Sequence, residues 1–109
     1  MPGCMKPYMK NLKNLVAMLR FLLSEPKRSI IRILSENVKG TSEIHQALQK
    51  KGFNIPRSTL YYYLSTLAEA GIIEMVGYRE EGGGAPEKLW RLKVSKVGIN
   101  LISGEIFKE

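Results

Sequence analysis

The chain has 109 residues, with 17 Lys or Arg against 10 acidic residues, so its formal net charge is +7. Hydrophobic residues make up 44% of the chain, which is enough to build one core and argues against a disordered protein. The length leaves no room for a second core, which argues against a multidomain enzyme. The basic charge balance favours a polyanionic partner, with nucleic acid ahead of an anionic membrane surface.

The positive charge is concentrated near the start of the chain. Residues 1–35 carry seven bases and a single acid, whereas residues 71–109 carry six of each. We hypothesise that Lys27, Arg28 and Arg32 face DNA phosphates beside the groove or form a basic surface shared by a dimer.

The sequence offers no set of residues for catalysis. Cys4 is the one cysteine and His45 the one histidine, so neither a disulfide nor a zinc site nor a catalytic dyad is expected. No phosphate-binding loop or dinucleotide motif occurs. We therefore expect no enzyme activity and no cofactor. The apolar stretch Leu12–Leu23 is interrupted by Arg20 and is too short to span a bilayer, so we expect a cytoplasmic protein without a membrane partner.

The N-terminal part of the chain predicts two helices. Residues 1–9 contain two prolines and a glycine and are expected to be flexible. Apolar residues with helical spacing then predict a helix over residues 10–23. Ser24 is expected to cap a second helix, which has Pro26 in its first turn and ends near Asn37.

Residues 41–71 are typical of two helices joined by a short turn. Thr41 or Ser42 is expected to cap the first helix with its hydroxyl. Pro56 is expected to start the second helix, and Gly71 to end it. The residues expected on the inward face of this second helix are Leu60, Leu64, Leu67 and Ala68.

Residues 72–94 change from helical to extended patterning. Ile72–Arg79 and Glu87–Val94 are the predicted strands of a hairpin, joined by the glycine-rich turn Glu80–Pro86. Trp90 on the second strand is expected in the core. A closing helix is expected over residues 95–107.

The order of these elements is that of a winged helix-turn-helix. The fold class is thus mainly α with a β-hairpin (α+β), with residues 10–109 as a single domain and extra helices at both ends. The connector Gly52–Ile55 is so short that the helices on either side of it must cross steeply. The second helix of that pair would lie in the major groove of DNA.

About half of the chain resembles the PadR group of winged-helix transcriptional regulators. The segments that carry the resemblance are Ser58–Glu74 and Arg79–Gly98. Its particular features are Thr59-Leu60-Tyr61, Ala70-Gly71-Ile72-Ile73, the Gly-Gly wing and Trp90-Arg91-Leu92. The resemblance implies a DNA-binding regulator that dimerises through its terminal helices.

Two departures leave a related small archaeal or bacterial winged-helix family as the alternative. Thr41-Ser42-Glu43 stands where many PadR-like regulators carry Gly-Tyr-Glu. The wing has Ala85 and Glu87 at positions where bases would be expected.

Candidate DNA contacts lie on the face of the second helix opposite its leucines. Arg57 can pair with guanine or phosphate, and hydroxyl groups can reach phosphate. Ser42 is placed to bind a phosphate at a helix N-terminus, with a simple helix cap as the alternative. Some tyrosines would instead pack against the wing or a partner. The full set of candidates is Arg57, Ser58, Thr59, Tyr61, Tyr62, Ser65, Ser42, Lys88 and Arg28.

The terminal helices over residues 10–23 and 95–107 exceed what a winged-helix core needs. We expect them to form a two-fold homodimer, with packing within one chain as the alternative. The residues expected at this interface are Leu12, Leu15, Leu19, Leu22, Leu101 and Ile102.

The sequence as a whole predicts a dimeric, sequence-specific regulator of transcription that binds double-stranded DNA and acts as a repressor. A winged-helix module for protein contacts in the transcription or replication machinery is the alternative, favoured by the acidic wing. A nucleoid or RNA-binding protein without sequence preference is a third reading. A small-molecule effector is left open, because no residue set points to a ligand.

Overall fold

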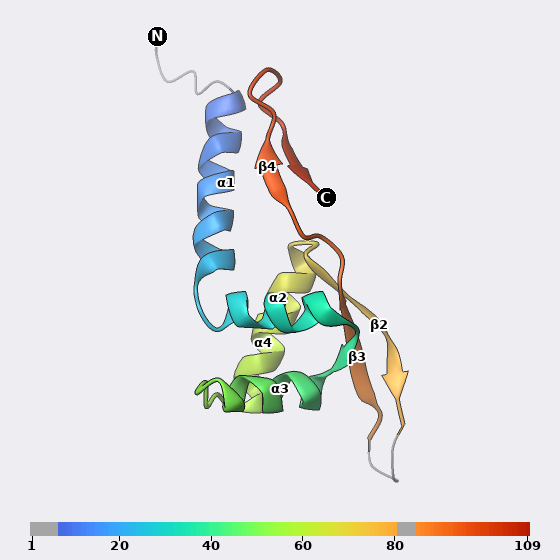
Figure 1. The fold of residues 1–109 in the computed structure, drawn as a ribbon. Coiled ribbons are helices and arrows are strands. Elements are labelled where there is room, and N and C mark those ends of the chain that lie inside the picture. The colour runs from blue at the N-terminus through green and yellow to red at the C-terminus, as the bar shows by residue number, and fades with distance from the viewer. Residues whose placement is uncertain (1–6, 81–84) are drawn as a thin grey trace.

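A computed structural model describes residues 7–80 and 85–109 of the chain (Figure 1). Its helices are α1 (Pro7–Leu23), α2 (Lys27–Glu36), α3 (Thr41–Lys50) and α4 (Arg57–Glu69). Its strands are β1 (Lys39–Gly40), β2 (Ile73–Arg79), β3 (Glu87–Leu92), β4 (Val97–Ile99) and β5 (Ile106–Lys108). The succession α2, α3, α4 and hairpin confirms the predicted α+β winged helix-turn-helix.

The core lies between α2, α3 and α4. On α4, Leu60, Leu64 and Leu67 are 0% exposed, because their spacing puts all three on one face of the helix. Ile30 of α2 and Ile44 of α3 are buried to the same extent. This packing fixes the rotation of α4 and so determines which of its side chains face solvent.

The three-stranded sheet has the order β1-β3-β2 and is antiparallel throughout. β2 and β3 form the wing, and their pairing begins with Ile73 opposite Leu92. β1 lies on the other side of β3, with Lys39 opposite Trp90. Two residues are too few to show an alternating pattern, so β1 was not predicted. The expected burial of Trp90 is confirmed.

The predicted closing helix over residues 95–107 is wrong, because this segment forms an antiparallel hairpin of β4 and β5. The Asn100 carboxamide oxygen accepts the backbone N–H groups of Ile102 and Ser103, at 2.9 and 3.1 Å. Gly104 then adopts a positive φ of 78°. This local turn chemistry outweighs the apolar spacing, since glycine and β-branched residues also lower helix propensity.

Helix α1 begins earlier than expected, at Pro7. Residues 7–9 are thus helical rather than flexible, because proline is tolerated in the first turn of a helix. Residues 1–6, including Cys4, lie outside the described part of the chain.

The predicted cap of α2 also differs. The Ser24 hydroxyl donates to the Phe21 carbonyl at 2.8 Å, and so does not cap α2. The Glu25 carboxylate instead accepts the Ser29 N–H at 2.9 Å in the first turn of the helix. The helix therefore still begins with a side-chain acceptor, one residue later in the chain than expected.

The molecule is elongated, with extents of 63 × 26 × 21 Å and a radius of gyration of 16.7 Å. A compact domain of this length has a radius of gyration of about 13 Å. The extra length comes from α1 and the β4–β5 hairpin, which lie side by side at the end opposite α3 (Figure 1). We call these two elements the arm. Of the helices that the structure describes, none is long and apolar enough to cross a membrane.

Candidate nucleic-acid interface

The outward face of α4 presents a cluster of polar and aromatic side chains. Because the leucines of α4 point into the core, Arg57, Ser58 and Ser65 are exposed on the opposite side. Tyr61 is 42% and Tyr62 is 67% exposed. Thr59 is half-buried beside them. The N-terminal half of α4 thus brings together the predicted candidates that lie on this helix.

The neighbouring Tyr63 is half-buried and packs with a cation from α2. Lys27 Nζ lies 5.1 Å from the centre of the Tyr63 ring and 4.5 Å from that of Phe21. Both distances are within the range of a cation–π interaction. Lys27 therefore lies against aromatic rings between α1 and α4.

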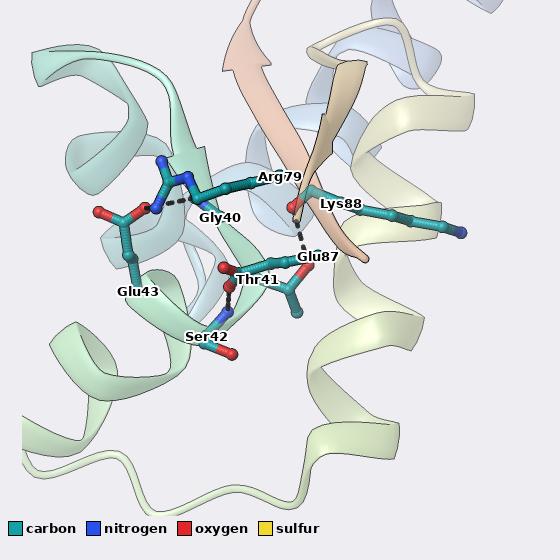
Figure 2. A network of polar contacts seen from close by, with 7 residues as sticks. All are labelled: Gly40, Thr41, Ser42, Glu43, Arg79, Glu87 and Lys88. Atoms are coloured by element: carbon teal, nitrogen blue, oxygen red, sulfur yellow. Dashed lines mark hydrogen bonds and ion pairs between the residues drawn. The ribbon is translucent and has the colours of Figure 1, made fainter. Parts of the chain in front are cut away.

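The N-terminus of α3 is tied to both α4 and the wing, as Figure 2 shows for the wing side. Arg57 Nη2 donates to Ser42 Oγ at 3.0 Å, which joins the first residue of α4 to α3. The Ser42 N–H donates to the Glu87 carboxylate at the start of β3. The predicted hydroxyl cap is therefore replaced by a carboxylate from the wing, a favourable partner for the positive end of a helix.

Glu87 reaches this position because Gly40 has no side chain. A Cβ at Gly40 would lie 2.5 Å from the carboxyl carbon of Glu87. Thr41 is buried, and its hydroxyl accepts the Trp90 Nε1–H at 3.0 Å and lies 3.3 Å from the Lys88 carbonyl oxygen. The side chains at the start of α3 are thus occupied in fastening the wing.

Glu43 adds an ion pair to the same junction. Its Oε1 accepts the Gly40 N–H at 3.0 Å and lies 2.7 Å from Arg79 Nη1 (Figure 2). The Gly40 hydrogen bond and then the Arg79 guanidinium lower the pKa of the Glu43 carboxyl below its ordinary value.

Most wing cations already have acidic partners. Arg79 pairs with Glu43, and Arg91 pairs with Glu74. Lys88 is exposed and makes no ion pair with the residues that the structure describes, and in Figure 2 its side chain points away from the polar network. Lys88 is thus the wing cation best placed to meet a phosphate. Residues 81–84 of the predicted turn lie outside the described chain.

The structure does not bring Arg28 to the other candidates. Arg28 and Arg32 line a cavity between α1, α2 and the segment after β3. The start of α4 lies at the other end of the molecule from the arm (Figure 1). The basic residues of α2 are therefore at the base of the arm.

Two functional features were missed by the sequence interpretation. His45 Nε2 donates to the Ile55 carbonyl at 2.7 Å and so fixes the turn before α4. Glu87 was treated only as a charge that offsets nearby bases. Each contact joins residues far apart in the chain, and no local spacing signals it.

Comparison with known proteins follows from this geometry. The sequence profile of the ferric uptake regulator family matches residues 20–83, which contain α2, the helix-turn-helix and β2. A search of curated proteins finds no match.

Two similar solved structures share the overall arrangement only in part. A possible transcriptional regulator for arsenical resistance is 20% identical with a TM-score of 0.49, over 68% of this chain and 66% of that one. A PadR family transcriptional regulator from Eggerthella lenta DSM 2243 is 23% identical with a TM-score of 0.47, over 78% of this chain and 71% of that one.

Proposed function

The chain belongs to the ferric uptake regulator family, whose members are DNA-binding transcriptional regulators rather than enzymes, and we propose that it represses transcription as a homodimer. In this proposal, each copy places the N-terminal half of α4 in the major groove of a two-fold symmetric site. The observation that carries it is the outward face of α4. Arg57, Tyr61 and Tyr62 remain exposed there although the opposite face is fully buried.

Arg57 is the residue that we expect to contribute most to recognition. One of its N–H groups donates to Ser42 Oγ at 3.0 Å, which restrains the guanidinium at the start of α4. Arginine has five N–H donors, so four remain for a guanine edge or a phosphate. Tyr62 lies further along the same exposed face and offers a hydroxyl and an apolar ring to the groove.

The proposed dimer would form through the arm. Leu19 is 36%, Leu101 86% and Ile102 99% exposed, and such apolar side chains favour burial against a second copy. Leu15 and Leu22 are buried within their own chain, so they support the arm from inside. The side chain of Leu12 lies outside the described part. We therefore assign the interface to the exposed members of the predicted set.

Iron, which the family is named for, does not fit the side chains of this chain. One His, one Cys and no Asp are present in the sequence. Among the described residues, no three His, Cys, Asp or Glu side chains lie close enough together to hold a metal ion. His45 already donates to the Ile55 carbonyl. The proposed function therefore uses no metal ion.

Selection of bound sequences from random duplex DNA tests this function. The proposal predicts a consensus with two inverted half-sites about one helical turn apart, and weaker binding at higher salt. Arg20→Ala, which removes the same charge from the arm, serves as the control for Arg57→Ala. Recovery of no consensus by the wild-type protein at either of two salt concentrations would contradict sequence-specific regulation.

A further inference from the structure

A cavity of about 240 Å³ lies where the arm joins the helix-turn-helix. Its walls come from α1, α2, the start of β2 and the segment that links β3 to β4. Leu22 and Ile72 are buried at its base, and Ile31, Val94 and Val97 are half-buried around them. The interior is therefore mainly hydrocarbon.

Three cations line the same cavity, and no acidic residue does. Arg28, Arg32 and Lys96 are all exposed, so their charged groups lie at the mouth rather than at the base. None of them forms an ion pair with the described residues. Lys96 and Glu109 contact each other through backbone hydrogen bonds, at 2.8 and 2.9 Å. The cavity thus combines an apolar interior with an uncompensated positive rim.

We propose that this cavity binds a small amphipathic monoanion, with a hydrocarbon body inside and a carboxylate among the three cations. A water molecule takes about 30 Å³, so the cavity holds a ligand of roughly eight non-hydrogen atoms. A carboxylate accepts bidentate hydrogen bonds from arginine, and two arginines lie on one face of α2 at positions i and i+4. A neutral or cationic ligand of the same shape would leave the positive rim unpaired.

The position of the cavity gives such a ligand a means to affect DNA binding, a step that rests on the proposed function. The ligand contacts α1 of the arm together with α2 and Ile72 of the DNA-binding part. In a dimer held by the arms, the angle at this joint sets the distance between the two α4 helices. A ligand that prefers one angle shifts the population toward it and changes affinity for a site of fixed spacing.

Titration of the full chain with three six-carbon probes tests the site without DNA. Hexanoate, 1-hexanol and hexylammonium share one hydrocarbon body and differ in charge. We expect hexanoate to bind at least tenfold more tightly than either other probe in calorimetry, and to shift the backbone amide signals of Ile31 and Val97 in NMR spectra. Absence of hexanoate binding, or equal binding of all three probes, would overturn the proposal.

Matched variants locate the binding. Arg32→Met should reduce hexanoate affinity at least fivefold and leave 1-hexanol unaffected, whereas Lys50→Met, an exposed charge on α3, should change neither. Ile31→Trp should fill the cavity and abolish binding, with folding checked by circular dichroism. Unchanged hexanoate affinity in both Arg32→Met and Ile31→Trp would place the ligand elsewhere and overturn the site.

DNA binding is then measured separately with saturating hexanoate. We expect at least a threefold change in affinity for the selected site in the wild type and none in Ile31→Trp. If hexanoate binds but DNA affinity stays constant, the effector role is overturned and the ligand site stands. If no specific DNA is bound at all, the proposed function fails, while the titration still decides the ligand site. If Ile31→Trp instead alters the dimer and no probe binds, the cavity is part of the interface between copies.

Discussion

Thr41 connects the wing to α3 inside the core. Its hydroxyl oxygen accepts the Trp90 indole N–H at 3.0 Å and lies 3.3 Å from the Lys88 carbonyl oxygen. Thr41 is 1% and Trp90 6% exposed, so water cannot replace the hydroxyl. A buried donor without a partner loses its hydration with no compensation.

Thr41→Val should therefore lower the free energy of unfolding by about 1–3 kcal/mol. Valine keeps the shape of threonine and removes only the hydroxyl. Urea denaturation followed by the fluorescence of Trp90, the single tryptophan, measures the change. Thr41→Ser keeps the hydroxyl and should lose clearly less stability. An equal loss in both variants would show that packing matters at this position and the hydrogen bond does not.

Glu43 makes the stability of the same junction dependent on pH. Its pKa is lowered in the folded protein from the ordinary value of 4.5 by the Gly40 N–H and then by Arg79. A lowered pKa means that the carboxylate stabilises the fold above its unfolded pKa. That contribution is lost as the pH falls through the folded pKa.

Glu43→Gln should thus destabilise the protein at pH 7, by less than about 1 kcal/mol because the pair is partly exposed. The difference from wild type should shrink as the pH falls below 4.5. Thermal unfolding of both proteins between pH 3 and pH 7 measures it. A difference that stays constant over this range would contradict the role of the Glu43 carboxylate.

At the scale of elements, the sequence predicted α4 and the wing well and the C-terminal segment badly. Leu60, Leu64 and Leu67 form a full helical stripe, and the glycine-rich turn punctuates the hairpin clearly. Residues 95–107 also show apolar spacing that fits a helix. Asn100 and Gly104 decide against it, because their turn chemistry acts through hydrogen bonds and backbone angles that periodicity does not detect.

Gly104→Ala distinguishes the hairpin from the helix by the sign of its effect. Gly104 has a φ of 78°, so alanine there should destabilise the hairpin by about 1 kcal/mol. In a helix, the same substitution would stabilise the protein by a similar amount. Urea denaturation gives the sign directly. A gain in stability would contradict the β4–β5 hairpin.

At the scale of the whole molecule, the arm accounts for the elongated shape. It keeps Leu101 and Ile102 at its surface, where a single chain leaves them in water. The hydrophobic effect favours the removal of such side chains from water, and two copies joined by their arms would achieve this.

We therefore expect the protein to have the mass of a dimer in light scattering at micromolar concentration. Leu101→Lys/Ile102→Lys should shift it to monomer, because the charges would face one another across the interface. Both residues lie in the exposed turn, so the fold should be retained in circular dichroism spectra. Wild-type protein with the mass of a monomer would contradict assembly through the arm.

The distribution of charge over the molecule could be only partly predicted. The excess of bases near the N-terminus is evident from the sequence, but Lys27 packs on aromatic rings and Arg28 and Arg32 surround a cavity. Similarly, Arg79 and Glu87 are used to hold the wing against α3. These roles depend on contacts between distant parts of the chain, and no local pattern encodes them.

The central claim is that the outward face of α4 reads DNA. Its most direct test is the affinity of Arg57→Ala, Tyr62→Ala and the control Arg20→Ala for the selected site, measured by fluorescence anisotropy at one salt concentration. The account predicts a loss of about 1–3 kcal/mol for Arg57→Ala, a smaller loss for Tyr62→Ala and no site-specific loss for the control. Unchanged affinity in both α4 variants would contradict it.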